Sequence, residues 1–351
     1  MIQRRNSKQI QIGNIKIGAG APISVQSMTN TDTRNVKSTL KQINNMFESG
    51  CELVRLAILN PEAAEAVREI KKLSPIPLIA DIHFDYRLAI KCIENGIDAL
   101  RINPGNIGKE ENIKKVVSLA KTNNIPIRIG INGGSLEKDL EQMNIPLADK
   151  MVTSALRHIK ILEDNNFDNI KISLKSSDVL TTIEAYRIIA KKVDYPLHLG
   201  VTEAGTYTGG IIKSAVGLGT LLAEGIGDTI RVSLTDSPVE EVKAGFMILK
   251  SLGLRQKGIN FVSCPTCGRT QIDLISLAKE VEKRLENFDK PLTIAVMGCA
   301  VNGPGEARHA DYGIAGGIKE GYIFKKGEII KRLPEEKLVD EFINLIQMEN
   351  V

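Results

Sequence analysis

Short runs of β-branched and other apolar residues alternate with amphipathic stretches along most of the chain. Eight such runs occur, at 22–29, 53–57, 78–84, 99–105, 125–132, 169–175, 197–203 and 229–235. Helix-compatible stretches such as 61–73 and 178–193 lie between them. Strands that alternate with helices at this spacing predict a parallel sheet. Eight units in roughly 250 residues are typical of a closed (β/α)8 TIM barrel, which we favour over an open, doubly wound sheet.

Two further patterns mark the boundaries of the predicted barrel. The segment QIQIGNIKIG (9–18) alternates in period two around a Gly–Asn pair, which predicts a hairpin that closes the bottom of the barrel. The stretch 238–253 has the pattern of an eighth helix. We therefore assign residues 1–253 to a TIM-barrel domain that binds the substrate.

The C-terminal part of the chain has a pattern of its own. Residues 254–260 are polar and unpatterned, and we interpret them as a linker. Residues 261–351 then contain a predicted helix at 271–288, a strand at 292–297, a hairpin around Lys326 and Gly327, and a terminal helix at 334–347. This order predicts a small α+β domain with a modest core, which a bound metal cluster would help to hold together.

Composition excludes several classes of protein. The 351 residues are 42% hydrophobic and 25% charged, with a net charge of +4, which is too small to indicate nucleic-acid binding. No apolar run is long enough to span a membrane, and the first ten residues have no apolar core of a secretory signal. A cytoplasmic location is the expectation. Five cysteines are an odd and sparse set, which indicates reduced thiols.

Cationic residues recur on the predicted strands. In a TIM barrel the chemistry lies at the carboxyl ends of the strands. The cations there are Arg55, Arg101, Arg128, Lys175 and Arg231. The available anions are Asp81 and Glu203, so the converging positive charge needs a polyanion, most simply a phosphate or diphosphate. No GxxxxGK[ST] loop is present, which argues against a P-loop nucleotide site.

Three residues of this predicted mouth are candidates for proton transfer. His83 and His198 are each as consistent with a hydrogen-bonded core histidine as with a proton donor. Glu203 lies at a strand exit between Thr202 and Gly205, and we regard it as the better acid–base candidate. A carboxylate among arginines stays ionised until the substrate neutralises them.

The cysteines divide into core and candidate ligand residues. Cys51 and Cys92 lie in apolar patterns and are predicted to be packed in the core. Cys264 and Cys267 form a C-x-x-C pair, and Cys299 follows a predicted strand. Three thiolates can hold three corners of an iron–sulfur cube, with Glu306 after the NGPG turn as a weak fourth ligand. The same thiolates with His309 fit a structural zinc, so the residues alone leave both metals open.

The motifs resemble those of the 4-hydroxy-3-methylbut-2-enyl diphosphate synthase family along the whole chain, in its shorter, two-domain bacterial form. They are SVQSMTNTDT (24–33), ADIHFDYRLA (80–89), RINPGNIG (101–108), RIGINGGSLE (128–137), SLKSSD (173–178), HLGVTEAG (198–205), GIGDTIRVSLT (225–235), SCPTCGRT (263–270) and GCAVNGPGEARHADYGIAGG (298–317). The resemblance implies a [4Fe–4S] cluster held by Cys264, Cys267, Cys299 and Glu306. It also implies that Arg55, Arg101, Arg128, Lys175 and Ser233 hold the diphosphate, with Asn132 nearby, and that Glu203 is the acid–base residue. We include Asp81, His83 and Arg231 of the same mouth among the predicted substrate-binding residues.

The resemblance implies reductive ring opening of 2-C-methyl-D-erythritol 2,4-cyclodiphosphate, with flavodoxin or ferredoxin as the electron donor. The predicted last barrel helix ends opposite the mouth, and seven linker residues reach at most ~23–25 Å. We therefore expect a head-to-tail homodimer in which one subunit's cluster serves its partner's mouth. The alternative from the residues is a Schiff-base aldolase that uses Lys175 and carries a structural zinc. A non-catalytic metabolite-binding protein fits the polar mouth poorly.

Overall fold

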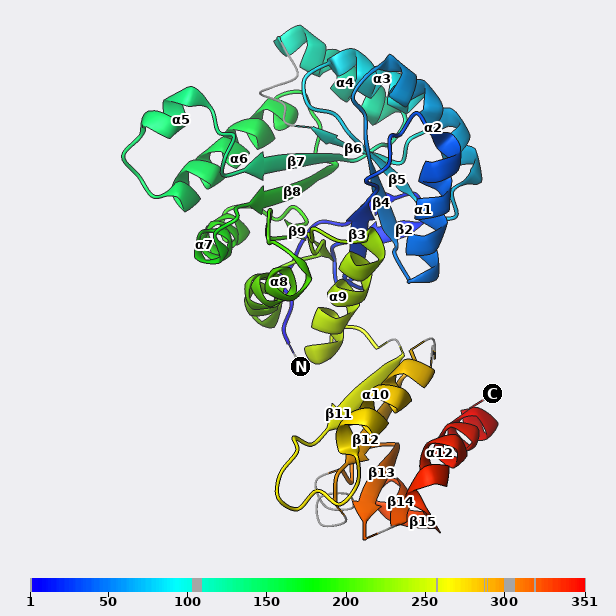
Figure 1. Cartoon of the computed structure of the whole chain (residues 1–351). Coiled ribbons are helices and arrows are strands. Elements are labelled where there is room, and N and C mark those ends of the chain that lie inside the picture. The colour runs from blue at the N-terminus through cyan, green and yellow to red at the C-terminus, as the bar shows by residue number, and fades with distance from the viewer. Residues whose placement is uncertain are drawn as a thin grey trace. The chain divides into compact units, whose positions relative to one another are not determined.

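The computed structural model describes residues 2–102, 109–256, 258–286, 288, 290–299, 307–318 and 320–350. The chain divides into two compact units, Met1–Arg255 and Gln256–Val351, and Figure 1 shows the helices and strands of both. No helix among the described residues is both long and apolar enough to cross a membrane.

The first unit is a parallel barrel, as the sequence predicted. Its strands are β3 (Ser24–Met28), β4 (Leu53–Ala57), β5 (Leu78–Asp81), β6 (Ala99–Ile102), β7 (Ile127–Asn132), β8 (Ile170–Lys175), β9 (His198–Leu199) and β10 (Thr229–Ile230). They pair in the order β8-β7-β6-β5-β4-β3-β10-β9, and a parallel bridge between Ile172 and Leu197 joins β8 to β9. Each strand lies inside a predicted run, although β9 and β10 are short because the chain turns into loops early.

Helices separate the strands and surround them (Figure 1). Their bounds are α1 (Val36–Glu48), α2 (Pro61–Leu73), α3 (Tyr86–Glu94), α4 (Glu110–Thr122), α5 (Lys138–Gln142), α6 (Leu147–Glu163), α7 (Val179–Ala190), α8 (Tyr207–Ala223) and α9 (Pro238–Ser251). Local signals set several starts. The side chain of Asn60 accepts the backbone N–H of Ala63, and Pro61 occupies the first turn of α2, where its missing N–H costs nothing.

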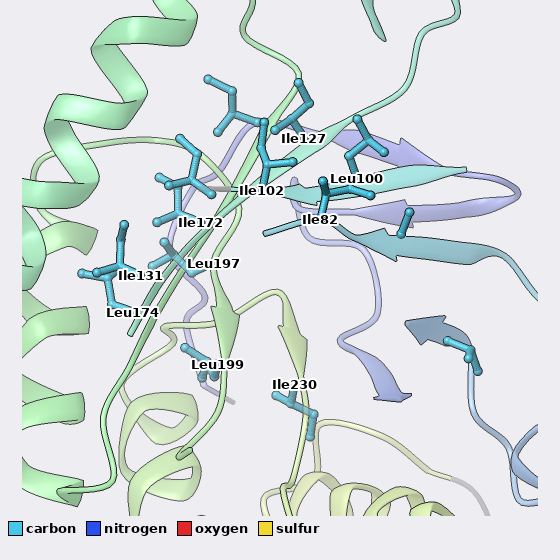
Figure 2. Packing of buried hydrophobic residues seen from close by; sticks show 14 of the residues in the cluster. Ile82, Leu100, Ile102, Ile127, Ile131, Ile172, Leu174, Leu197, Leu199 and Ile230 are labelled. Carbon is cyan, nitrogen blue, oxygen red and sulfur yellow. The ribbon is translucent and has the colours of Figure 1, made fainter. Parts of the chain in front are cut away.

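Apolar residues on the outer face of the barrel strands form the main core. Figure 2 shows Ile127, Ile172, Leu174 and Ile230 among the side chains that pack in this layer. Because side chains alternate between the two faces of a strand, the intervening residues point into the barrel. The same alternation therefore buries isoleucine and leucine outside and places the charged residues of these strands inside.

The predicted N-terminal hairpin forms and closes the bottom of the barrel. Its strands are β1 (Ile10–Ile12) and β2 (Ile15–Ile17), which pair antiparallel around Gly13. Ile10, Ile12 and Ile17 pack against Leu53 and Ile79, which lie at the amino ends of barrel strands. This confirms the placement of the hairpin at the end opposite the mouth.

The second unit is an α+β fold. Its elements are β11 (Ile259–Ser263), α10 (Leu274–Arg284), β12 (Leu292–Met297), β13 (Tyr312–Gly317), β14 (Glu320–Lys325), β15 (Glu328–Leu333) and α12 (Glu335–Asn350). The sheet order is β11-β12-β13-β14-β15, with the first three strands parallel and the last two pairings antiparallel. Both helices pack on this sheet through a core that includes Val281, Ile294 and Phe342.

Two strands of this unit differ from the sequence prediction. β11 begins at Ile259, inside the segment 254–260 that we interpreted as an unpatterned linker. It is an edge strand and half-exposed, so its apolar alternation is weak. β13 has the sequence YGIAGG, whose glycines are typical of a loop, and the sequence analysis did not predict a strand there. A Cβ at Gly313 would overlap the ring of Phe324. Glycine is present there because an aromatic ring on β14 covers the backbone.

Candidate active site

The interior of the barrel is strongly cationic. Alternation along the strands turns six cations inward: Arg55, Arg101, Arg128, Lys171, Lys175 and Arg231. Among the described residues of this unit three carboxylates are buried: Asp81, Asp228 and Glu241. Asp228 precedes β10 and pairs with Arg4 and Arg5 of the N-terminal arm, so it does not neutralise the mouth. The excess positive charge that the sequence predicted is therefore present.

Asp81, the last residue of β5, joins two of these arginines. Its Oδ1 accepts Nη1 of Arg101 at 3.1 Å, and its Oδ2 lies 3.6 Å from both Nε of Arg55 and Nε2 of His83. Burial by itself raises the pKa of this carboxyl, but the charge of Arg55, the neighbouring His83 imidazole and the charges of Arg101 and Arg128 together hold its pKa well below the usual range. Asp81 is therefore a permanent anion that fixes the spacing of the arginines.

Two inward-facing glycines make room for the long cations. A Cβ at Gly130 would lie 2.4 Å from Nε of Arg101, whose Nη2 donates to the carbonyl of Gly130 at 3.2 Å. A Cβ at Gly200 would lie 2.5 Å from Nζ of Lys175. Any larger residue at either position would displace a cation, which explains why these strands carry glycine at inward positions.

Arg128 differs from its predicted position at a carboxyl end. It is the second residue of β7, while Asn132 and Lys175, which are paired in register, end β7 and β8. Arg128 is 2% exposed, and its Nε and Nη1 have no hydrogen-bond partner among the described residues. Burial lowers its pKa well below the usual value, and the charges of Arg55 and Arg101 add to this. Such an unpaired buried cation is available for an anion.

Lys171 was missed by the sequence analysis. It points inward two positions before Ser173 and four before Lys175, so the same period of two could have found it. Its side chain is 1% exposed, Nζ has no partner among the residues described, and it faces Ile10 and Ile12 of the hairpin. Burial, followed by the charge of Arg128, lowers its pKa well below the usual value.

Replacing Lys171 with Met should raise the stability of the fold at neutral pH by up to about 4 kcal/mol. At pH values between the lowered pKa of Lys171 and its ordinary value of ~10.4, the folded protein binds fewer protons than the unfolded chain. The free energy of unfolding of the wild-type protein therefore rises with pH across this range. The gain from Lys171→Met should therefore shrink as the pH approaches about 10. Denaturant unfolding at neutral and alkaline pH measures this.

The exposed Lys41 of α1 provides a matched control for this prediction. Lys41→Met removes the same charge from a solvated position and should leave stability within about 0.5 kcal/mol at both pH values. A loss of stability in Lys171→Met at neutral pH would mean that the buried lysine is paired in solution.

Arg231 follows β10 and is held by a residue that the sequence analysis did not single out. Glu241 on α9 accepts Nε and Nη2 of Arg231, each at 3.1 Å. The arginine is half-buried, and the glutamate is buried. The only sequence signal for Glu241 was an acidic residue in the first turn of a helix, which is common and carries no information about its partner.

The remaining candidates occupy different environments. His198 is completely buried, and its Nδ1 lies 2.7 Å from Oγ1 of Thr229. Burial and the nearby lysines and arginines hold its pKa well below the usual value, which makes it a neutral core histidine. Glu203 is exposed, with a left-handed φ of 52°, and Ser233 is half-buried. The backbone N–H of Thr235 donates to the carbonyl of Gly205, which ties together the loops that carry Glu203 and Ser233.

The candidate metal ligands lie at the carboxyl ends of parallel strands in the second unit. Cys264 directly follows β11, and Cys299 follows β12 after Gly298. The backbone N–H of Gly298 donates to Sγ of Cys264 at 3.2 Å, so the two loops are in direct contact. N–H donation to a cysteine sulfur is a feature of iron–sulfur sites, where it tunes the reduction potential.

The third thiol is the most accessible one. Cys267 is exposed, and its backbone N–H donates to Oγ1 of Thr270 at 3.1 Å. Its pKa is lowered, chiefly because the backbone N–H of Arg269 donates to the thiolate and the Arg269 side chain adds a second hydrogen bond. A lowered pKa favours the thiolate form that binds metals. Cys51 and Cys92 are buried, as predicted for core residues.

Glu306 and the NGPG turn lie outside the described residues, so the fourth predicted ligand is not placed. Within the described ranges no three His, Cys, Asp or Glu side chains are grouped closely enough to hold a metal ion. The thiols nevertheless come from adjacent loops, and small residues, Ala307, Ala310 and Ala315, pack near Cys264. The donor set and its placement therefore fit an iron–sulfur cluster better than the hard, oxygen-rich sites of calcium or magnesium.

Comparison with known proteins gives a consistent result for both units. A family model described as the GcpE TIM-barrel domain matches residues 7–246, and one described as the GcpE protein C-terminal domain matches residues 260–348. The chain is 60% identical over 347 residues to the 4-hydroxy-3-methylbut-2-en-1-yl diphosphate synthase (flavodoxin) of Clostridium perfringens, covering 99% of each protein. It is also 60% identical over 341 residues to the enzyme of that name from Geobacter sulfurreducens, covering 97% of each.

The solved structures of two other enzymes align with about seven tenths of this chain. Dihydropteroate synthase from Stenotrophomonas maltophilia aligns with a TM-score of 0.54 at 12% identity, over 70% of this chain and 97% of that one. A truncated 3-deoxy-D-arabino-heptulosonate 7-phosphate synthase from Thermotoga maritima aligns with a TM-score of 0.50 at 16% identity, over 71% and 94% of the two chains. At such low identity these matches support the fold and carry no information about the reaction.

Proposed function

The chain belongs to the GcpE family, and from this premise we propose that it is the iron–sulfur oxidoreductase of isoprenoid biosynthesis that the sequence resembles. Its substrate is then 2-C-methyl-D-erythritol 2,4-cyclodiphosphate, and its product is (E)-4-hydroxy-3-methylbut-2-enyl diphosphate. In this reaction two electrons and two protons are taken up, one ring C–O bond to phosphate breaks, and a hydroxyl leaves as water. The Schiff-base aldolase alternative is not favoured, because the relatives match over the full length of the chain.

The observation that carries this proposal is the surplus of buried cations inside the barrel. Arg55, Arg101, Arg128 and Lys175 converge there, and Asp81 can balance only part of their charge. A diphosphate supplies the missing negative charge, and arginine forks bind phosphate oxygens with defined geometry. We infer that these four residues, with Asn132, Ser233 and the half-buried Arg231, bind the diphosphate of the substrate.

Asp81 and His83 then orient the arginines rather than the substrate, because the carboxylate of Asp81 already contacts Arg55, Arg101 and His83. Glu203 is our candidate for proton transfer to the leaving hydroxyl. It lies on the loop after β9, and its exposure leaves the carboxylate accessible to a bound substrate.

We propose that Cys264, Cys267, Cys299 and Glu306 hold a [4Fe–4S] cluster. The bound cluster would supply electrons one at a time together with a Lewis-acidic iron. The thiols would hold it, the N–H of Gly298 would stabilise the charge on the sulfur of Cys264, and the carboxylate of Glu306 would be the more easily displaced ligand. Flavodoxin is the proposed electron donor, as the names of the relatives state for those enzymes, with ferredoxin as the alternative.

The proposed activity is tested with protein purified without oxygen. Reduced flavodoxin and the cyclic diphosphate should give the linear diphosphate, identified by mass spectrometry, and reduced ferredoxin can replace flavodoxin in a parallel reaction. Iron and sulfide analysis distinguishes the cluster from zinc. Colourless, zinc-containing protein that borohydride links to a carbonyl substrate at Lys175 would contradict the proposal.

We further propose that the enzyme acts as a head-to-tail homodimer. Arg255 ends the first unit, and its guanidinium donates to Glu52 at 3.0 and 3.1 Å and to the carbonyl of Ile23 at 2.7 Å. Ile23 and Glu52 immediately precede β3 and β4, so Arg255 is anchored at the end of the barrel opposite the mouth. The chain therefore leaves the barrel at the end opposite the mouth. This favours an active site in which the cluster comes from the partner subunit.

Co-expression of a Glu203→Gln chain with a Cys299→Ala chain tests the dimer. Each variant alone should be inactive, whereas the mixture should recover about one quarter of wild-type activity, because half of the dimers are mixed and each has one intact site. Differently tagged chains allow the mixed dimer to be purified. Mixed dimers without activity would show that each subunit uses its own cluster.

A further inference from the structure

Glu241 is a buried carboxylate on α9 that accepts four hydrogen bonds. Its Oε2 accepts Oγ of Ser27 at 2.7 Å and Nε of Arg231 at 3.1 Å. Its Oε1 accepts Nη2 of Arg231 and the backbone N–H of Leu234, both at 3.1 Å. With both oxygens saturated and only 4% of the residue exposed, Glu241 is not available to substrate or to proton transfer.

These contacts connect three separate elements. Glu241 lies in the first turn of α9, Ser27 is in β3, and Arg231 and Leu234 follow β10. The two parallel hydrogen bonds to Arg231 fix the plane of the guanidinium, since a bidentate fork allows one orientation. The bond to Leu234 holds the backbone beside Ser233, a proposed phosphate ligand. Glu241 therefore sets the position of a cation and of a loop at once.

A methionine extends this arrangement across the mouth. Nη1 of Arg231 lies 3.7 Å from the sulfur of Met28, and the same sulfur is 3.0 Å from Nε and 2.8 Å from Nη2 of Arg55. Arg55 in turn faces Asp81. A neutral, polarizable thioether thus stands between two guanidinium groups. Each guanidinium also has a carboxylate neighbour: Glu241 binds Nε and Nη2 of Arg231, and Asp81 lies near Nε of Arg55.

We propose that Glu241 is a positioning residue for diphosphate binding, which acts through Arg231 and the Met28 sulfur to hold Arg55 and Arg231 at a fixed separation. This inference rests on the proposed function, because it identifies the diphosphate as the group that the two arginines are spaced to receive. Met28 lies between the two guanidinium groups, Asp81 pairs with Arg55, and Glu241 pairs with Arg231.

Two accounts of Glu241 make opposite predictions. If the carboxylate matters only as a negative charge near the mouth, its removal leaves more positive charge and should tighten binding of an anion. If it positions Arg231, its removal frees the guanidinium and should weaken binding. The effect expected of a residue that orients a ligand-binding group is a loss of about 10–100-fold.

The experiment measures binding of inorganic diphosphate to the holoenzyme by calorimetry under anaerobic conditions. Glu241→Gln should weaken binding by about 10-fold or more, and the neighbouring Glu240→Gln serves as the control, since Glu240 pairs with Lys243 instead. Met28→Leu keeps the apolar volume, removes the sulfur acceptor, and should weaken binding to a smaller extent. Unchanged or tighter binding in Glu241→Gln would overturn the proposal.

A charge-conserving variant and a double mutant separate positioning from folding. Glu241→Asp keeps the charge but is one methylene shorter, so weaker binding with an unchanged melting temperature supports positioning, and wild-type binding contradicts it. In an Arg231→Met background the Glu241→Gln change should have a much smaller effect on binding, because only the contact with Leu234 remains to be perturbed, whereas a purely structural role would give additive losses. Diphosphate binding is measured without turnover, so it is independent of whether the cyclic diphosphate is converted.

Discussion

Replacing Cys299 with alanine is expected to abolish turnover and to leave the purified protein without iron and sulfide. Cys299 is buried and follows β12 after Gly298, whose backbone N–H donates to the sulfur of Cys264. Loss of one thiolate leaves two cysteines and a carboxylate, which is too few soft ligands for a cubane cluster. Iron and sulfide content, visible absorption and product formation with reduced flavodoxin measure the result, and circular dichroism reports on the fold.

Cys92→Ala is the matched control for this prediction. Cys92 is completely buried in α3 of the barrel and is predicted to be a core residue. Its replacement removes a thiol of similar burial and should leave the iron content and the colour unchanged, with a small loss of stability from the deleted atom. If Cys299→Ala retained a full complement of iron and its activity, the proposed ligand set would be wrong.

Replacing Arg128 with methionine should have two effects of opposite sign. We expect kcat/KM to fall by about 10²–10³-fold, as for the loss of one preorganised charge donor in an active site. We also expect the melting temperature to rise, because Nε and Nη1 of Arg128 lack hydrogen-bond partners among the described residues and Arg55 and Arg101 repel it. Kinetics with reduced flavodoxin and thermal unfolding of the same preparation measure both quantities.

Lys171→Met is the natural comparison for Arg128→Met. Lys171 is paired in register with Arg128 on the adjacent strand, and both line the cavity beside Ile10 and Ile12 of the hairpin, but the charge of Arg128 also acts on Asp81 in the mouth. Its replacement should raise stability while activity is retained. If Arg128→Met lost both stability and activity, Arg128 would be part of a structural network instead of an anion site. If it gained stability and kept its activity, Arg128 would not bind the substrate.

Much of the barrel and its mouth could be predicted because the relevant signals are local. Alternation within β7 and β8 places Arg128 and Lys175 on the inner face, whatever the rest of the chain does. The number of strand–helix units then predicts a closed barrel, which brings inward residues from different strands together. The glycine and cysteine motifs similarly indicated the family, which the comparisons confirm.

Other features could not be predicted because they depend on contacts between distant segments. The partner of Glu241 is decided by the rotation of α9 against β3, and no local pattern records that rotation. β11 is a half-exposed edge strand that begins inside the segment 254–260, and β13 carries three glycines, one of which the Phe324 ring requires, so neither strand was predicted. His198 illustrates the same limit, since only its complete burial makes it a core residue.

By itself the sequence determined the strand count, the inward and outward faces of each strand, and hence which cations share the barrel interior. These follow from the period of two along a strand and from the regular strand–helix spacing. Only the tertiary structure decided how those cations are held: Asp81 between Arg55 and Arg101, Met28 between Arg55 and Arg231, and Glu241 behind Arg231. Pairing of this kind depends on the register of neighbouring strands and the packing of a helix, which form only when segments far apart in the chain meet.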